Sequence, residues 1–290
     1  MNNSAYNPNQ NHLLGALPDI EFNRLAPFLE LVSLQTGDVL CESGEKLSSV
    51  YFPISSTISL QNLLENGSSS EVTGIGNEGM LGTMLLMGGQ SMPSRAIVQI
   101  AGQAYKLRAD ILLKEFYLAG TTLRLLLRYT QALITQTTQT AVCNRHHTIE
   151  QQLCRWLLVT NDRVSTREIK VTQETIANIL GVRREGVTEA AGHLQSLGYI
   201  HYRRGHITIS NQRGLQELVC ECHAVVKKEF ARLMCDDMHR QGAHQSLPIV
   251  LTPIFPPVFV PEFKPGTPPV APKLPLPNIF SSNGAGLIGR

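Results

Sequence analysis

The spacing of apolar residues changes along the chain and predicts a β-rich first part. From Leu34 to about Arg108, short apolar runs such as "TGDVL", "SSTISLQNL" and "RAIVQIAG" are separated by glycine-containing stretches. Strands at this spacing are typical of a β-sandwich or barrel, and we expect "ENGSSS" to be an exposed hairpin tip. The polar residues 1–16 are predicted to be loosely structured. "PDIEFNRLAPFLELVSLQ" has the apolar spacing of one or two short helices.

A helical pattern replaces the strands from Ala109 to about Arg163, where Gly120 is the exception to a near absence of glycine. A heptad-spaced stripe lies within this stretch. It consists of Leu126, Tyr129, Leu133, Gln136 and Thr140. Such a stripe either pairs with a second copy of the chain or packs against the chain's own β domain, and the pattern leaves both alternatives open.

Residues 171–210 predict two short helices joined at a glycine and followed by two strands. Thr172 is the expected N-cap of the first helix, Gly181 supplies the left-handed residue of the turn, and Gly198 ends the second helix. The positions expected to be buried are Ile176, Ile179, Leu180, Val187, Ala190, Ala191, Leu194 and Leu197. One further helix is expected within residues 211–240.

The polar residues of this unit indicate a winged helix-turn-helix that binds double-stranded DNA. An α-helix fits the major groove, where arginine bonds guanine and a carboxylate accepts from cytosine. The hairpin tip would lie beside the phosphates and position the domain without reading sequence. The predicted DNA-binding residues are Thr172, Arg183, Arg184, Glu185, Thr188, Glu189, Arg203, Arg204 and His206, and His193 is expected on the same helix face.

Composition and charge agree with two folded domains. The 290 residues are 42% hydrophobic with a net charge of +2, distributed as −3 over residues 1–142 and +3 over residues 143–240. No run reaches the roughly 18 apolar residues of a membrane helix, and the N-terminus does not resemble a secretory signal. The six scattered cysteines are typical of reduced thiols in a cytoplasm. Residues 241–290 hold eleven of the sixteen prolines and are predicted to be a disordered tail.

The order of these parts resembles the Crp–Fnr superfamily of bacterial transcription regulators. The likeness is most specific in "TQETIANILGVRREGVTEAAGHL", whereas "NEGMLG" and "CNRHHTIEQQLCRWLL" resemble a less characterised branch. The resemblance implies an α+β fold of four parts. They are a cyclic-nucleotide-binding-like β-roll at 15–120, a dimerisation helix at 121–142, a winged helix-turn-helix domain at 143–240 and the proline-rich tail at 241–290.

The resemblance also implies partners. A homodimer joined along the long helix would bind an inverted-repeat operator and act with RNA polymerase, without catalysis. The family's early Arg-Glu pair is matched by Arg184 and Glu185. Many members have a further arginine one turn later, and Glu189 stands at that place. The operator sequence of the best-known members is therefore not expected to be the one that this chain binds.

The residues with which members of the family bind a cyclic nucleotide effector are altered in this sequence. Relatives that bind cyclic nucleotides hold the ribose with a Gly-Glu pair and the cyclic phosphate with an Arg-Ser pair. Here Gly82 and Thr83 stand at the first place, and Ser94 and Arg95, in reversed order, at the second. A shift of one residue along a strand turns a side chain to the other face, so we expect no cyclic AMP and no cofactor. The apolar residues Met80, Met84, Leu85, Leu86 and Met87 either line a pocket for a different small ligand or fill the core.

Two alternative functions rest on other segments. Cys220, Cys222 and His223 could make the protein a metal- or redox-responsive regulator. However, Cys-x-Cys on one helix directs the thiols to different faces, so a tetrahedral site would need ligands such as Cys143, His146 or His147. No metal site is therefore predicted. The proline-rich tail could serve as a protein-interaction module. The sequence contains neither a nucleophile–base signature nor a phosphate loop, so it does not indicate an enzyme.

Overall fold

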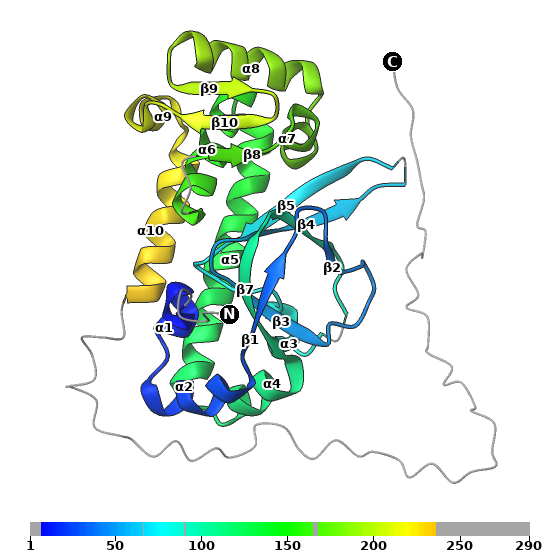
Figure 1. The fold of residues 1–290 in the computed structure, drawn as a ribbon, viewed down its shortest axis with the longest axis vertical. Helices are drawn as coiled ribbons and strands as arrows, with labels where there is room; N and C mark the ends of the chain where they lie inside the picture. Colours follow the sequence, from blue (N-terminus) through cyan, green and yellow to red (C-terminus); the bar gives the residue numbers. More distant parts are fainter. Residues whose placement is uncertain (1–6, 66, 90, 165–167, 236–290) are drawn as a thin grey trace, which may run out of the picture. The chain divides into compact units, whose positions relative to one another are not determined.

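The computed structural model describes residues 7–65, 67–89, 91–164 and 168–235. In this part of the chain, a β-rich domain is followed by a long helix and by helices around a small sheet, so the predicted α+β architecture is confirmed (Figure 1). The predicted tail at 241–290 lies outside the described residues. No described helix is long and apolar enough to cross a membrane.

Two antiparallel sheets form the N-terminal domain, with strand orders β1-β7-β3 and β2-β6-β4-β5. The strands are β1 Glu30–Leu34, β2 Val39–Cys41, β3 Ser49–Pro53, β4 Thr57–Leu63, β5 Ser69–Ile75, β6 Arg95–Ile100 and β7 Gly102–Arg108. The core between them buries Phe52, Ile58 and Met80 almost completely. Leu63 pairs with Ser69 at the end of the β4–β5 ladder, which confirms the hairpin predicted at "ENGSSS".

The N-terminal segment is folded where the structure describes it, so the prediction of a loose segment at 1–16 is wrong there. It contains a 3₁₀ helix at Pro8–Gln10 and α1 at His12–Gly15. Leu13 is 1% exposed. The buried Asn11 amide donates to Pro53 O at 2.9 Å and to Gly79 O at 2.8 Å. The side-chain NH₂ group of Asn11 thus has two carbonyl acceptors. Without them, burial of this amide would be unfavourable.

The following apolar stretch is helical only in its first half. Helix α2 spans Asp19–Leu25 and a 3₁₀ turn spans Ala26–Phe28, whereas the rest of the stretch is strand β1. Strand β1 pairs with β7 along its whole length, from Glu30 opposite Lys106 to Leu34 opposite Gly102. Pairing with a distant strand overrides the local apolar spacing. Two more helices cover this domain, α3 at Thr83–Leu86 and α4 at Ala109–Tyr117.

Helix α5, Thr121–His146, is the predicted long helix. Its heptad-spaced stripe packs inside the chain: Leu126, Tyr129 and Leu133 belong to the N-terminal core. Gln136 Nε2 donates to Gly74 O in β5 at 2.7 Å. Of the two alternatives for this stripe, packing against the chain's own β domain is therefore the one observed.

The "NEGMLG" segment after β5 receives the Tyr129 ring. A Cβ atom on Gly79 would lie 2.2 Å from Tyr129 Oη, so only glycine leaves room for the ring. The Tyr129 hydroxyl donates to Met80 O at 3.1 Å. Gly82 has φ +127°, and a Cβ there would lie 2.6 Å from the Val50 side chain. Two of the glycines in this motif are thus required by close approach and backbone conformation.

The C-terminal part forms a winged unit in which β8, β10 and β9 make one sheet beside α7 and α8 (Figure 1). Its elements are α6 Ile149–Arg163, β8 Glu168–Lys170, α7 Gln173–Leu180, α8 Arg184–Ser196, β9 Ile200–Arg203, β10 His206–Ile209, α9 Gln212–Leu218 and α10 Glu221–Cys235. The sequence patterns did not predict β8. The single helix expected within 211–240 is two helices, because Val219 and Cys220 interrupt it.

An arginine at the end of α6 joins the winged unit to the loop after β5. Arg163 Nη2 donates to Glu78 Oε1 at 2.6 Å, to Gly74 O at 2.9 Å and to Gln136 Oε1 at 3.2 Å. The side chains of Arg163 and Glu78 are only 10% and 18% exposed. Charges this far from water need such partners to be tolerated.

The variant Arg163→Ala should lower the free energy of unfolding by about 3 kcal/mol, because it leaves the Glu78 carboxylate nearly buried without its cation. Urea unfolding of the full chain measures this loss. Arg108→Ala is the matched control, since Arg108 pairs with Asp110 while both side chains are largely exposed. Its unfolding midpoint should stay close to that of the parent protein. Equal losses in the two variants would contradict the role given to Arg163.

Candidate nucleic-acid interface

Helices α7 and α8 form the helix-turn-helix pair. Thr172 Oγ1 accepts from Thr175 N at 3.1 Å, which confirms the predicted N-cap. Gly181 has φ +67° and makes the left-handed turn between the helices. The predicted core positions Ile176, Ile179, Leu180, Val187, Ala190, Ala191 and Leu194 are buried. Leu197 is wrongly predicted as buried: it is 42% exposed and lies after the last turn of α8.

The N-terminal end of α8 offers charged side chains to solvent. Arg183 is the N-cap residue with φ −73° and ψ +146°, and Arg184 begins the helix. Both are exposed, as are Glu185 and Glu189. Within the described residues, no ion pair holds either arginine. Their guanidinium groups are therefore free to bond another molecule.

Two other polar residues of α8 are exposed but bonded to neighbouring elements of the domain. Thr188 Oγ1 donates to Gln173 Oε1 at 3.0 Å and so ties α8 to the start of α7. His193 Nδ1 is paired with Glu150 of α6. The unpaired charged side chains described for α8 therefore lie on its first turns, whereas the exposed His193 ring is paired with α6.

Strands β9 and β10 form the predicted wing. Arg203 pairs with His206, so Arg204 and Gly205 are the two loop residues, with φ values of +49° and +80°. This pattern is that of a type I′ turn, in which Asn and Gly are favoured. Arg204 thus keeps a left-handed conformation that costs a non-glycine residue about 1–2 kcal/mol. His206 Nδ1 lies 3.0 Å from Glu168 Oε1 of β8, although the two atoms are not aligned for a hydrogen bond.

The structure brings three of the predicted residues to one open depression. Thr172, Arg184 and Arg204 line it, together with Gln173, Glu174, Tyr202 and Gly205. The Tyr202 hydroxyl donates to Val171 O at 3.2 Å. Burial raises the pKa of Tyr202, against the opposing effect of the Arg184 charge, so the phenol stays protonated. Sequence reasoning missed Gln173 and Tyr202, because only the folded wing places Tyr202 beside α8.

The altered effector residues are engaged by neighbours. Thr83 is 5% exposed at the start of α3. Ser94 Oγ donates to Asn62 Oδ1 at 2.7 Å, and Arg95 Nε lies 3.2 Å from Glu42 Oε2. The charge of Arg95 is therefore matched by a carboxylate of the protein. Of the apolar strip, Met80, Leu85 and Leu86 are buried in the core, whereas Met87 is 63% exposed.

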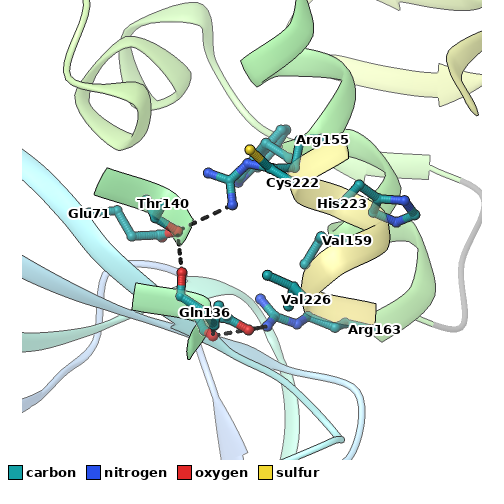
Figure 2. A pocket seen from close by; sticks show the side chains of 11 residues that line it. Glu71, Gln136, Thr140, Arg155, Val159, Arg163, Cys222, His223 and Val226 are labelled. Carbon is teal, nitrogen blue, oxygen red and sulfur yellow. Dashed lines mark hydrogen bonds between the residues drawn. The ribbon is translucent and has the colours of Figure 1, made fainter. Parts of the chain in front are cut away.

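A small polar cavity lies among β5, α5, α6 and α10 (Figure 2). Burial raises the pKa of Glu71, which accepts from Ser59 and Gln99. Arg155 Nη1 donates to Thr140 Oγ1 at 3.2 Å. The cavity measures about 40 Å³, room for a few waters at about 10–15 Å³ each and not for a nucleotide. No sequence signal could have found it, because its residues come from four distant elements.

The cysteines of "CECH" are arranged differently from the prediction. The expectation that Cys220 and Cys222 point apart assumed one continuous helix, but Cys220 precedes α10 and only Cys222 lies within it. Both are buried beside Cys143. His223 does not belong to this group; it lines the cavity of Figure 2, where burial lowers its pKa.

Comparison with protein families gives two matches. A family model described as a Crp-like helix-turn-helix domain matches residues 151–218, and one described as a cyclic nucleotide-binding domain matches residues 31–116. Together these matches cover more than half of the chain. None of the curated proteins compared with the chain matches it significantly.

Solved structures share the fold. FixK2 from Bradyrhizobium japonicum is 17% identical with a TM-score of 0.58, covering 66% of this chain and 98% of its own. Two transcriptional regulators from Thermus thermophilus are similar. TTHB099 is 16% identical with a TM-score of 0.54, covering 64% of this chain and 95% of its own. TTHA1359 is 20% identical with a TM-score of 0.51, covering 65% of this chain and 97% of its own.

The two matched domains, in the order seen in the structure, define a transcription regulator with a cyclic-nucleotide-binding-like domain and a helix-turn-helix domain. The chain belongs to the Crp–Fnr superfamily.

The wing turn gives a test of backbone strain at this surface. Arg204→Asn should raise the free energy of unfolding by up to about 1 kcal/mol, because Asn adopts positive φ at lower cost. Gly205→Ala should lower it, since alanine must adopt φ +80°. Urea unfolding of both variants measures the two changes. If Arg204→Asn destabilised the protein, the strain assigned to Arg204 would be wrong.

Proposed function

We propose that this regulator binds an inverted-repeat operator in double-stranded DNA as a homodimer, in the cytoplasm. It acts on transcription through RNA polymerase and not by catalysis. One observation carries the proposal: the exposed Arg184 and Arg204 line the same depression, one at the start of α8 and the other at the wing tip. Two cations placed this way suit a groove edge and its neighbouring phosphates.

The first turns of α8 would read bases. Arg184 can bond the two acceptors of guanine, and Glu185 and Glu189 can accept from the amino group of cytosine. Arg183 and Thr188 flank this group, and the Thr188 hydroxyl is oriented by Gln173. Arg203, Arg204 and the start of α7 at Thr172 would contact phosphate, which positions the domain without reading sequence.

Homodimerisation would use the face of α5 that the chain leaves uncovered. Leu127 is 45% exposed and Ile134 is 54% exposed, one heptad apart, and Ala141 continues the spacing. This stripe is shifted by one residue from the stripe predicted from sequence, which is buried within the chain. An exposed heptad pattern on a long helix supports pairing with a second copy.

The sensor domain does not bind cyclic AMP in this proposal. A cyclic phosphate needs an available cation, and Arg95 already lies beside Glu42. The ribose would also lack the family's glutamate, whose place is taken by Thr83. The signal to which the domain responds is therefore of another kind.

Two arginine variants test the division of roles. Arg184→Ala should weaken binding to the preferred operator by about 1–3 kcal/mol and relax selection at one base position. Arg203→Ala should weaken binding to all duplexes alike and lessen the salt dependence. Fluorescence anisotropy with specific and scrambled duplexes over a salt series measures both.

Arg108→Ala is the matched control for these variants, since it removes one exposed positive charge from the N-terminal domain. Its DNA affinity should equal that of the parent protein. If Arg184→Ala and Arg203→Ala weakened all duplexes equally, the assignment of Arg184 to base reading would be wrong.

The dimer face can be tested separately. Ile134→Glu should raise the dimer dissociation constant at least tenfold, because it places a carboxylate in an apolar contact. Sedimentation equilibrium measures this constant. Leu118→Glu, at an apolar residue that is 62% exposed after α4, is the control and should leave the mass unchanged. A parent-like dimer in Ile134→Glu would rule out this face.

The first experiment is selection of binding sites from random duplex DNA with the full chain at about 0.1 M salt, which suppresses non-specific phosphate binding. Enrichment of an inverted repeat supports the proposal. Enrichment of single half-sites would contradict a dimeric reader, and no enrichment would contradict specific binding by the protein without an effector.

A further inference from the structure

Three cysteines and a histidine converge where α5 ends and α10 begins. Cys143 lies in the last turns of α5, His147 caps that helix, and Cys220 and Cys222 lie on either side of the first residue of α10. Their four ligand atoms all lie within 4.8 Å of one another. The three cysteines are buried and His147 is half-buried. They belong to two segments far apart in the chain, so only the tertiary structure assembles them.

The spacing fits a single tetrahedral metal ion. Cys143 Sγ lies 3.6 Å from Cys220 Sγ, and Cys222 Sγ lies 3.4 Å from His147 Nδ1. Four ligands around zinc, at zinc–sulfur distances of about 2.3 Å, are separated by about 3.8 Å along each edge of the tetrahedron. An iron–sulfur cluster would need its thiolates more widely spread, because iron and sulfide atoms lie between them.

The residues around the four ligands resemble the outer shell of a metal site. The other ring nitrogen of His147, Nε2, lies 3.3 Å from Glu221 Oε1. A carboxylate in this place orients a metal-binding imidazole and makes its free nitrogen more basic. Gln139 Nε2 donates to Cys222 Sγ at 3.1 Å, a contact that stabilises a thiolate.

The charge balance also favours a divalent ion. Zinc with three thiolates carries a net charge of −1, and the nearby Arg155 guanidinium carries +1. Arg155 and Cys222 line the same small cavity. Arg155 Nε is buried and has no hydrogen-bond partner among the described residues. A thiolate at this site would give the guanidinium a second anionic neighbour besides Glu71.

Buried cysteines often pack simply as small apolar residues. Packing alone does not account for an imidazole nitrogen directed at Cys222, nor for the carboxylate on the other side of that ring. Cys41 offers the contrast: it is a buried thiol in the N-terminal core, and its hydrogen-bond acceptors among the described residues are the carbonyl oxygens of Glu42 and Glu45.

We propose that Cys143, His147, Cys220 and Cys222 bind one Zn²⁺ ion as a structural site. Zinc displaces the thiol protons on binding and neither gains nor loses electrons. The ion would link the start of α10 to the end of α5, immediately before α6, the first helix of the winged unit. The site is independent of the proposed operator binding, since all four ligands lie outside the recognition helix and the wing.

Zinc content of the full chain tests this proposal without any DNA. The protein is purified under reducing conditions, supplied with zinc and freed of excess metal. We expect one zinc ion per chain in the parent protein and in Cys41→Ser, and loss of zinc in Cys143→Ser and Cys222→Ser. His147→Cys, which keeps four ligands, should retain zinc, whereas His147→Ala should bind it less tightly.

Cobalt substitution keeps the test valid if a serine variant fails to fold. The parent protein loaded with Co²⁺ should show a thiolate-to-cobalt charge-transfer band and the intense visible bands of tetrahedral coordination. A chelator should lower the melting temperature of the parent protein. Zinc content in the parent equal to that of Cys143→Ser, an octahedral cobalt spectrum, or a Cys143–Cys220 disulfide formed in the presence of zinc would each overturn the proposal.

Discussion

One face of α5 is buried in the N-terminal domain because the loop after β5 makes room for Tyr129. Gly79 has no side chain to exclude the ring, and Met80 O accepts the phenol proton at 3.1 Å. The phenol is fully buried, and burial raises its pKa far above the ordinary value of 10.0. It therefore stays protonated and keeps this bond. The remaining functional surfaces depend on this contact, because it fixes which side of α5 faces inward.

Once that face is buried, the other properties of α5 follow from helical geometry. The residues one position along from the buried stripe point away from the N-terminal core, so Leu127 and Ile134 remain exposed on the surface proposed for dimerisation. The same helix carries Cys143 near its end, beside Cys220 and Cys222. Helix α10 then returns along α5, where the Phe230 ring lies 6.4 Å from that of Tyr129 (Figure 1). The proposed dimer face and one of the proposed metal ligands thus lie on the helix that packs against the N-terminal domain.

Polar contacts join the N-terminal domain to the winged unit, in addition to apolar contacts such as that of Ile100 with the C-terminal core. Arg163 bonds Glu78, Gly74 O and Gln136, and the neighbouring cavity holds Glu71 and Arg155 (Figure 2). Buried polar contacts are directional and costly to leave unsatisfied. These contacts connect β5 and the loop after it to α6, which precedes the helix-turn-helix.

Elements whose signals are local could be predicted from the sequence. The glycine turns at Gly181 and Gly198, the cap at Thr172 and the apolar spacing of α7 and α8 depend on neighbouring residues, and so they were predictable. The β-rich domain, the long helix and the exposed Arg183 and Arg184 were predictable for the same reason. Leu197 was not, because its burial depends on whether the helix continues past it.

The remaining features depend on contacts between segments that are distant in the chain. Strand β1 exists because β7 pairs with it, and Asn11 is buried because two distant carbonyls accept its amide protons. The sequence left open what covers the heptad-spaced stripe of α5, because a heptad pattern does not distinguish a second copy of the chain from the chain's own β domain. The four proposed metal ligands form two pairs that are more than seventy residues apart in the sequence. The interruption between α9 and α10 at Val219 and Cys220 places both thiols of the second pair beside Cys143. Contacts between distant segments depend on the whole fold, and no local pattern encodes them.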